Sequence, residues 1–255
     1  MKNTIPAKPV PYYDTGTGIQ SAPVILELPR AVECRIISRV NRFVVEVEVG
    51  GQTHRAHITN TGRLEQFLVA GKTAYCLPKE KPARTDFLLF AIKDGNTAAL
   101  IDTRLQMQAF EQAVEKGLIP WLKGWRISKR NARLGTSLID YLLECADKTI
   151  YLEVKSAVLR DGKYAMYPDC PTLRGQKHIR ELTDYVKQGG EAIIQFIAAL
   201  PGVTAFKPYR TGNPVLCEHL EKANKAGVLM RAIQMVYVPA DGTVRLMNGN
   251  LRVEV

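Results

Sequence analysis

Residues 137–156 read SLIDYLLECADKTIYLEVKS, in which two apolar runs are separated by a short polar stretch. Each run predicts a β-strand, and the polar stretch predicts a tight hairpin turn between them. Because successive side chains of a strand point to opposite faces, Glu153 and Lys155 share one face of the second strand. The hairpin brings Asp140, the acid of the first strand, beside them. The stretch therefore predicts two carboxylates and an ammonium group on adjacent strands.

These three residues indicate a metal-dependent catalytic centre. Ionisable side chains on apolar strands are costly to bury unless they are paired or bind a metal. A divalent cation relieves the repulsion between two carboxylates, and hard oxygen ligands suit Mg²⁺ or Mn²⁺. We expect Asp140, Glu153 and the carbonyl of Val154 to be the metal ligands. The predicted catalytic residues are Asp140 and Glu153 together with Lys155, which would lie beside the attacking water and the phosphate.

The same pattern also fits an ordinary ion pair on an exposed sheet face, because Glu-x-Lys is short and common. The segment that follows favours the catalytic interpretation. Residues 173–187 predict a helix with Thr172 as its N-cap. Its first turns are rich in cations, which oppose the helix dipole and therefore favour an anionic partner such as a phosphate. The predicted nucleic-acid contacts on this helix are Arg174, Gln176, Lys177, His178 and Arg180, with Asp169 and Glu181 in supporting positions.

Outside this segment, the C-terminal half predicts a mixed α/β domain. Helical periodicity covers residues 104–116, and strands and helices then alternate in the order α-β-β-β-α-β-α-β. The remaining predicted elements are strands at 125–129, 137–144, 150–158, 191–199 and 229–238 and a helix at 215–225, closed by Gly227.

The N-terminal half predicts a small β-barrel of the OB type. Between residues 31 and 100 there are about five short strand patterns, and one of them ends at Gly50-Gly51, a hairpin turn. A short helix is predicted at 63–68. Small OB barrels bind single strands through a basic groove, and the predicted contacts here are Arg42, Arg63, Lys79 and Arg84.

The run Asn60-Thr61-Gly62-Arg63 has two possible roles. Its backbone amides are candidates for holding a phosphate at the N-terminus of the predicted short helix. The same residues are equally typical of ordinary turn and cap chemistry.

Charge and cysteine content narrow the class of protein. The 255 residues carry a formal net charge of +10, which favours contact with a polyanion, although excess lysine and arginine also keep proteins in solution. Five scattered cysteines without a CxxC pair argue against a disulfide framework or a zinc site. No secretory signal or membrane-spanning run is visible, so we expect a cytoplasmic protein.

Several segments give the chain a family resemblance. It resembles the sugar fermentation stimulation protein A family, and the likeness covers roughly residues 30 to 240. The matching segments are Asn60-Thr61-Gly62-Arg63-Leu64, Ile139-Asp140, Glu153-Val154-Lys155-Ser156, Pro168-Asp169, Arg174-Gly175-Gln176-Lys177-His178 and Glu181-Leu182, with a weaker match at residues 223–227.

The resemblance implies an OB domain followed by a PD-(D/E)XK nuclease-like domain that binds DNA. It implies that Asp140, Glu153 and Lys155 occupy the catalytic positions and that His178 and Glu181 lie on the helix motif. The family name records a link to the expression of sugar-utilisation genes. The chain departs from the family pattern at Leu138, where arginine is usual, at Asn213, where an acid is common, and in the extension of residues 1–28.

We therefore expect a poorly ordered or strap-like extension at 1–28, an OB domain at 29–102, a nuclease-like domain at 103–240 and a C-terminal segment at 241–255. The expected function is DNA binding, single- or double-stranded, with a nuclease-type site that hydrolyses phosphodiesters. The alternative is a non-specific DNA-binding or regulatory protein, linked to sugar-utilisation genes, on a catalytically silent nuclease fold. RNA or small-molecule binding by the barrel is a third possibility. No obligate protein partner can be read from the sequence.

Overall fold

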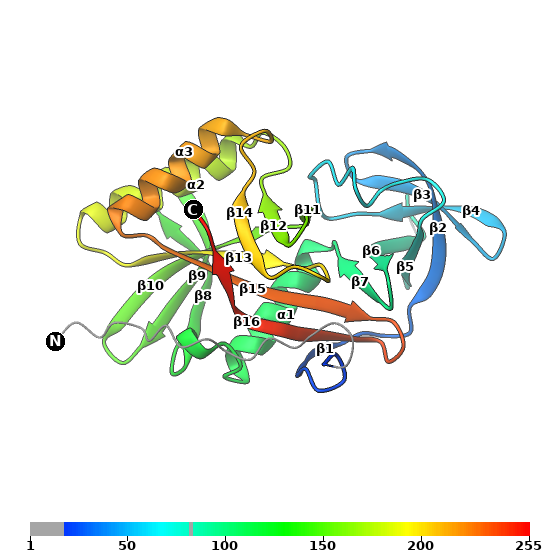
Figure 1. The fold of residues 1–255 in the computed structure, drawn as a ribbon, viewed down its shortest axis with the longest axis horizontal. Coiled ribbons are helices and arrows are strands. Elements are labelled where there is room, and N and C mark those ends of the chain that lie inside the picture. Colours follow the sequence, from blue (N-terminus) through cyan, green and yellow to red (C-terminus); the bar gives the residue numbers. More distant parts are fainter. Residues whose placement is uncertain (1–17, 82–83) are drawn as a thin grey trace.

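The computed structural model describes residues 18–81 and 84–255. They form an N-terminal β-barrel, at the right of Figure 1, and a larger α/β domain, at the left. The two parts are connected by hydrogen-bonded strands, because β7 (Thr97–Leu100) pairs with β6 (Phe87–Asp94) on the barrel side and with β15 (Leu229–Val238) of the α/β domain. The OB barrel and the mixed α/β domain expected from the sequence are both confirmed.

The barrel closes through five strands in the order β2-β3-β4-β6-β5 and back to β2. Its interior is filled by alternating residues such as Val45 and Val47, both fully buried. Gly50 and Gly51 have positive φ values of 58° and 79°, as the predicted hairpin turn requires. The remaining bounds are β2 (Val32–Asn41), β3 (Val44–Val49), β4 (Gln52–His57) and β5 (Thr73–Pro78).

The short helix predicted at 63–68 is wrong, because these residues form a loop with turns. Leu64 has a φ of 53°, in the left-handed region, which a right-handed helix cannot accommodate. The loop is held by contacts with distant parts of the chain, described below, and these override the local helical pattern.

The central sheet of the C-terminal domain has the order β8-β9-β10-β13-β15-β16. The strands from β8 to β10 are antiparallel, β10, β13 and β15 are parallel, and β16 returns antiparallel to β15. The bounds are β8 (Arg126–Leu134), β9 (Ser137–Cys145), β10 (Lys148–Ser156), β13 (Ala192–Ala198) and β16 (Thr243–Val253). A smaller arm adds β11 (Leu159–Asp161), β12 (Tyr164–Tyr167) and β14 (Ala205–Pro208).

Helices cover the two faces of this sheet. Tyr141 of β9 donates its hydroxyl to Glu111 of α1 (Thr103–Glu115), so α1 lies on the face of Tyr141. Asp140, its neighbour, points to the other face, which is covered by α2 (Leu173–Lys187) and α3 (Pro214–Ala226). A short 3-10 turn, η1 (Pro120–Leu122), follows α1. The α2 side of the sheet is therefore the side that carries the predicted catalytic residues.

The first and the last strand of the described residues pair with each other. Residues 1–17 of the predicted extension lie outside the described residues, and β1 (Val24–Glu27) pairs antiparallel with β16. Residues 243–253 of the predicted C-terminal segment form β16 and belong to the central sheet. The described residues contain no helix of the length and apolar character needed to cross a membrane.

Candidate functional site

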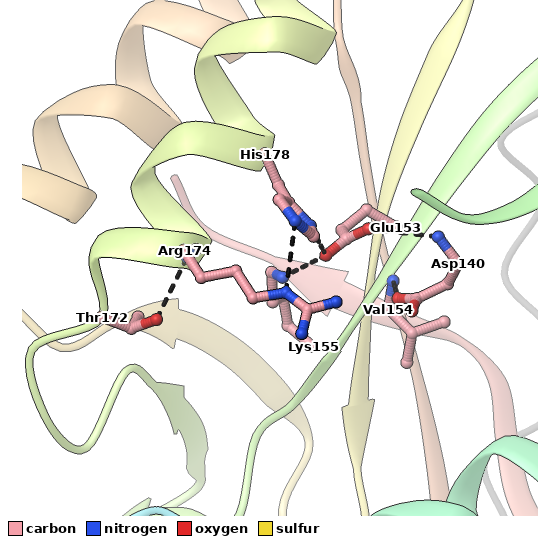
Figure 2. Close-up of polar contacts among 8 residues, drawn as sticks. Asp140, Glu153, Val154, Lys155, Thr172, Arg174 and His178 are labelled. Atoms are coloured by element: carbon pink, nitrogen blue, oxygen red, sulfur yellow. Dashed lines mark hydrogen bonds and ion pairs between the residues drawn. The ribbon is translucent and has the colours of Figure 1, made fainter. Parts of the chain in front are cut away.

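Asp140 and Glu153 lie side by side on β9 and β10. Tyr141 pairs with Leu152, so the next pair along the ladder sets Asp140 against Glu153. The backbone amide of Asp140 is 3.3 Å from Oε2 of Glu153, and the amide of Val154 donates to Oδ2 of Asp140 at 2.8 Å. Figure 2 shows both carboxylates in the space between the sheet and α2. The structure therefore has the predicted hairpin, with Asp140 of β9 beside Glu153 of β10.

Lys155 completes the cluster from the same face of β10. Its Nζ lies 2.5 Å from Oε1 of Glu153, and the exposed fractions of the two side chains are 11% and 2%. Burial alone would raise the pKa of Glu153, but the charges and hydrogen bonds of Lys155 and His178 outweigh it and lower the pKa to about 2. Burial opposes the charge on Lys155, yet Glu153 keeps the pKa of the ammonium group above its ordinary value. Both groups are therefore charged at neutral pH.

The pKa of Asp140 is shifted in the opposite direction to that of Glu153. Burial and the neighbouring charge of Glu153 raise its pKa to about 6, against the opposing effects of Lys155, the Val154 amide and His178. Asp140 thus carries a charge at pH 7 at a free-energy cost, because burial and the charge of Glu153 outweigh the help that Lys155 gives. A second positive charge beside Asp140 would remove that cost.

His178 reaches the cluster from α2. Its Nδ1 is 2.6 Å from Oε1 of Glu153, and Nε of Arg174 donates to its Nε2 at 3.4 Å, as Figure 2 shows. Because the ionised carboxylate of Glu153 can only accept, Nδ1 carries a proton and donates it to Glu153. Arg174, His178 and Glu153 therefore form a chain of hydrogen bonds directed towards the carboxylate.

The start of α2 explains how this helix comes so close to the sheet. Thr172 is the N-cap, as predicted, and its Oγ1 accepts from the amide of Gly175 at 3.1 Å. A Cβ at Gly175 would lie 2.8 Å from a Thr172 carbon and 3.0 Å from the Tyr167 hydroxyl. Only glycine fits there without displacing its neighbours, and it allows the first turn to sit against β12.

A cavity of about 350 Å³ opens beside Lys155, between the two domains. On the C-terminal side its wall includes Lys155, Asp169 and Arg174. On the barrel side it is formed by the loop of residues 59–62. We call this the catalytic cavity. Since the barrel supplies one wall, the cavity depends on how the domains are held together.

Asp169 fixes that arrangement. Its Oδ2 accepts from the amide of Leu64 at 3.1 Å, and a Cβ at Gly62 would lie 2.4 Å from the same oxygen. On the other side of the loop, Arg39 donates to the carbonyls of Gly62 and Arg63, both at 2.7 Å. The missing side chain at Gly62 is what allows the carboxylate to approach the loop. Arg39 is one of the basic residues that the sequence offers for a nucleic-acid groove, but periodicity carries no signal for this structural contact with a partner 23 residues away.

The same contacts bear on the phosphate site suggested for Asn60-Thr61-Gly62-Arg63. The amide of Gly62 donates to Oδ1 of Asn60 at 3.0 Å, and the amide of Leu64 donates to Asp169. These amides are already satisfied by acceptors of the protein itself. The carboxylate of Asp169 occupies the position of an anion at this loop, which corresponds to the turn and cap alternative.

The other predicted contacts on α2 turn away from the cavity. Gln176 is 3.4 Å from Asn213, the N-cap of α3, and Arg180 is 3.5 Å from His219 of α3. Glu181 accepts from the hydroxyl of Thr136 at 2.8 Å, and Lys177 donates to the carbonyl of Thr136 at 3.4 Å. These four side chains tie α2 to α3 and to the β8–β9 turn.

The predicted barrel contacts separate into two groups. Arg42 and Arg63 line a shallow hollow next to the catalytic cavity. Lys79 donates to the hydroxyl of Thr85 near the end of the β5–β6 connection, and Arg84 is exposed in the same connection. Lys79 and Arg84 line neither hollow.

The oxygen atoms of the cluster are of the type that binds a divalent cation. Asp140, Glu153 and the Val154 carbonyl are hard oxygen donors, and Mg²⁺ characteristically uses one or two carboxylates and keeps several waters. The charge of Asp140 is only partly compensated by its neighbours, and it is the feature that a cation would neutralise. Within residues 18–81 and 84–255, no group of three or more His, Cys, Asp or Glu side chains is arranged to hold a metal. The residues therefore fit a water-rich magnesium-type site better than an all-protein cage.

Comparisons with known proteins match both halves of the chain. A family model described as "Sugar fermentation stimulation protein RE domain" matches residues 104–241, and "SfsA N-terminal OB domain" matches residues 37–101. Sugar fermentation stimulation protein homologs of Pyrococcus furiosus and Archaeoglobus fulgidus are 47% and 45% identical over 231 residues, covering 91% of this chain and 99% of each relative. A solved structure described as "The structure of Pyrococcus Furiosus SfsA in complex with Ca2+" has a TM-score of 0.87 at 46% identity, covering 92% of this chain and 100% of that one.

Proposed function

The chain belongs to the sugar fermentation stimulation protein family, and on that premise we propose that it is a DNA-binding protein with a metal-dependent phosphodiesterase site. The observation that carries the proposal is the cluster of Asp140, Glu153 and Lys155, whose lysine lines a cavity that Arg174 also lines. Two acids and an amine on adjacent strands, with the amine reaching a cavity that Arg174 also lines, suit the binding and hydrolysis of a phosphodiester.

We assign the metal ligands as Asp140, Glu153 and the carbonyl of Val154, with Mg²⁺ or Mn²⁺ as the ion. The homologous Pyrococcus furiosus structure is described as a complex with Ca²⁺, which supports a divalent cation in the family. When bound, the cation would supply Lewis acidity and a nucleophilic water at neutral pH. The raised pKa of Asp140 supports this assignment, because a cation would stabilise the ionised form of that carboxyl.

The protein groups have separate roles in this proposal. Lys155 is held in its charged form by Glu153, so it acts as a fixed positive charge beside the scissile phosphate and not as a general base. His178 is a positioning residue, because it holds one oxygen of Glu153 and points the other towards Asp140. Arg174 lines the cavity and can pair with a phosphate oxygen while its Nε stays near His178.

DNA is the partner that the composition supports. The net charge of +10 favours a polyanion, and OB domains commonly bind nucleic acid strands. We place the protein in the cytoplasm, because all five cysteines are free thiols, as is typical of a reducing compartment.

The test is a cleavage assay on labelled single-stranded and duplex DNA with Mg²⁺ or Mn²⁺. Wild type should cut, chelator should abolish cutting, and Asp140→Asn should reduce the rate by at least about a hundredfold. An Arg252→Ala variant, altered at an exposed arginine paired with Glu254, is the control and should cut normally. Equal rates for wild type and Asp140→Asn would exclude this site as the catalyst.

One observation favours the second candidate, a DNA-binding or regulatory protein on a silent nuclease fold linked to sugar-utilisation genes. Among the described residues there is no ready group of three acidic, histidine or cysteine ligands, and Glu153 is already engaged by Lys155 and His178. This candidate is distinguished by salt-sensitive DNA binding without cleavage in any divalent metal. Strong preference for one operator sequence would favour a regulator over a non-specific binder.

A further inference from the structure

A second hollow, of about 430 Å³, lies beside the catalytic cavity. Its charged lining residues are Arg39, Arg42 and Arg63, and no acidic residue lines it. It shares Thr61, Gly62 and Cys170 with the catalytic cavity, so the two hollows are adjacent. We call it the arginine groove. Asp169, behind Gly62, attracts Arg39, so the repulsion that an anionic ligand would relieve is chiefly that between Arg42 and Arg63.

Arg39 stabilises the groove, whereas Arg42 and Arg63 are free to contact a ligand. Arg39 donates to the carbonyls of Asn41, Arg42, Gly62 and Arg63, so it holds the two loops that form the groove. The guanidinium group of Arg42 has no ion pair within the part of the chain that the structure describes. Arg63 has only Glu65, at 3.9 Å, with both side chains mostly exposed. Arg42 and Arg63 are therefore available for a ligand, whereas Arg39 is structural.

An exposed aromatic residue follows directly in the chain. Phe43 is 50% exposed although it begins the β3 side of the barrel, and its amide donates to Oδ1 of Asn41 at 2.8 Å. Phe43 is not among the residues that line the groove, but it follows Arg42 in the same turn. Single-stranded nucleic acids bind where bases can stack on an aromatic ring while phosphates meet cations.

The depth of the acids argues for a single strand over a duplex. Lys155 lines the catalytic cavity and is 11% exposed, and its partner Glu153 is 2% exposed, so a phosphodiester must enter the cavity to reach Lys155. Duplex DNA is stiff over roughly 150 base pairs and cannot bend one phosphate into a pocket without a deformation cost. A single strand is flexible, and it can follow the groove and turn inwards at the shared residues, Thr61, Gly62 and Cys170.

We propose that the arginine groove binds single-stranded DNA and leads one of its phosphodiesters into the catalytic cavity. This inference rests on the proposed nuclease function, which gives the delivery of a phosphodiester its role. Binding of the strand in the groove needs no metal and can be measured separately. The barrel is then the part of the protein that selects the substrate strand. The α/β domain supplies the groups that act on it.

Fluorescence anisotropy with a labelled oligonucleotide, as a single strand and as the matched duplex, tests the proposal in chelator, where cleavage does not interfere. Wild type should bind the single strand at least about tenfold more tightly. Arg42→Ala/Arg63→Ala should weaken that binding by about tenfold or more and lower the slope of log K against log salt by about 1.4. Phe43→Ala should weaken it about fivefold to 150-fold without changing the slope. Arg126→Ala, at the far end of the β8–β9 pair from Asp140, is the control.

The outcomes separate the two proposals. Duplex binding as tight as single-strand binding, or groove variants that bind like wild type, would overturn the groove, even if the protein cuts DNA with Mn²⁺. Groove-dependent binding of the single strand in a protein that never cuts would leave the groove standing and remove the nuclease function. Circular dichroism and the unfolding midpoint of each variant establish that weakened binding is not a loss of folding.

Discussion

Nδ1 of His178 lies 2.6 Å from Oε1 of Glu153, so a residue of α2 holds an acid of β10 in place. The same oxygen also accepts from Lys155, which leaves Oε2 to face Asp140. The orientation of Glu153 is therefore set by two donors from different elements. Removing one of them should disturb the proposed metal site without touching a metal ligand.

We expect His178→Ala to weaken Mn²⁺ binding by about 10- to 100-fold, the usual cost of losing a hydrogen bond that orients a ligand. His178→Asn retains an amide donor near the position of Nδ1 and should recover most of the affinity. Calorimetric titration with Mn²⁺ measures both. His219→Ala, at a histidine of α3, is the matched control, and equal affinities for all four proteins would show that His178 does not position Glu153.

Replacing the two acids should change stability in opposite directions. In the metal-free protein at pH 7, Asp140→Asn should raise the free energy of unfolding by roughly 1–3 kcal/mol, because it removes a buried charge whose pKa is raised to about 6. The folded state binds a proton at Asp140 that the unfolded state, with an ordinary pKa of 3.8, binds only at lower pH. The penalty is thus complete above about pH 6 and absent below about pH 4. Urea unfolding of both proteins across this range, in chelator, measures it.

Glu153→Gln should lower the free energy of unfolding by about 3–5 kcal/mol at pH 7, because it leaves Lys155 buried without its partner. The depressed pKa of Glu153 means that its contribution is present above its ordinary value of 4.5 and lost as the pH falls through about 2. A neutral or stabilising effect of Glu153→Gln would contradict the ion-pair geometry.

Lys155 should matter for cleavage and little for binding. We expect Lys155→Met to lower the cleavage rate by about 10²- to 10³-fold, the typical cost of one electrostatic donor, while the affinity for DNA in chelator stays within about twofold. Lys123→Met, at an exposed lysine beyond η1, should leave both unchanged. Loss of DNA affinity equal to the loss of rate would mean that Lys155 serves in binding alone.

The contact between Gly62 and Asp169 should behave as a coupled pair. Gly62→Ala places a Cβ 2.4 Å from the carboxylate, so we expect a loss of about 1–3 kcal/mol in the free energy of unfolding. Asp169→Ala removes the acceptor of the Leu64 amide and should also destabilise. The double variant relieves the clash and should lose less than the sum, as a double-mutant cycle would measure. Additive effects would show that the two residues do not touch in solution.

The cluster on β9, β10 and α2 could be predicted because its information is local. Strand alternation placed Glu153 and Lys155 on one face, a two-strand hairpin set Asp140 beside them, and Thr172 marked the start of α2. Each of these signals depends on residues that are close in the sequence, separated by no more than the length of one hairpin. The residues of the proposed chemistry are therefore the part of the site that the chain encodes most directly.

The wall of the cavity could not be predicted, because it is made by distant contacts. Asp169 and Leu64 are 105 residues apart, and their hydrogen bond replaces the helix that the local pattern indicated at 63–68. The three-residue strand β11 and the four-residue strands β12 and β14 are too short for alternation to reveal. The roles of Gln176 and Arg180 also depend on where α3 packs, which periodicity does not specify.

The proposal that Asp140 and Glu153 share a divalent cation is tested most directly by anomalous diffraction from crystals soaked in Mn²⁺. We expect one peak between the two carboxylates, within coordination distance of the Val154 carbonyl, and its loss in Asp140→Asn. A protein that shows no peak at Asp140, while Glu153 keeps its contacts with Lys155 and His178, would contradict the metal site and the catalysis that depends on it.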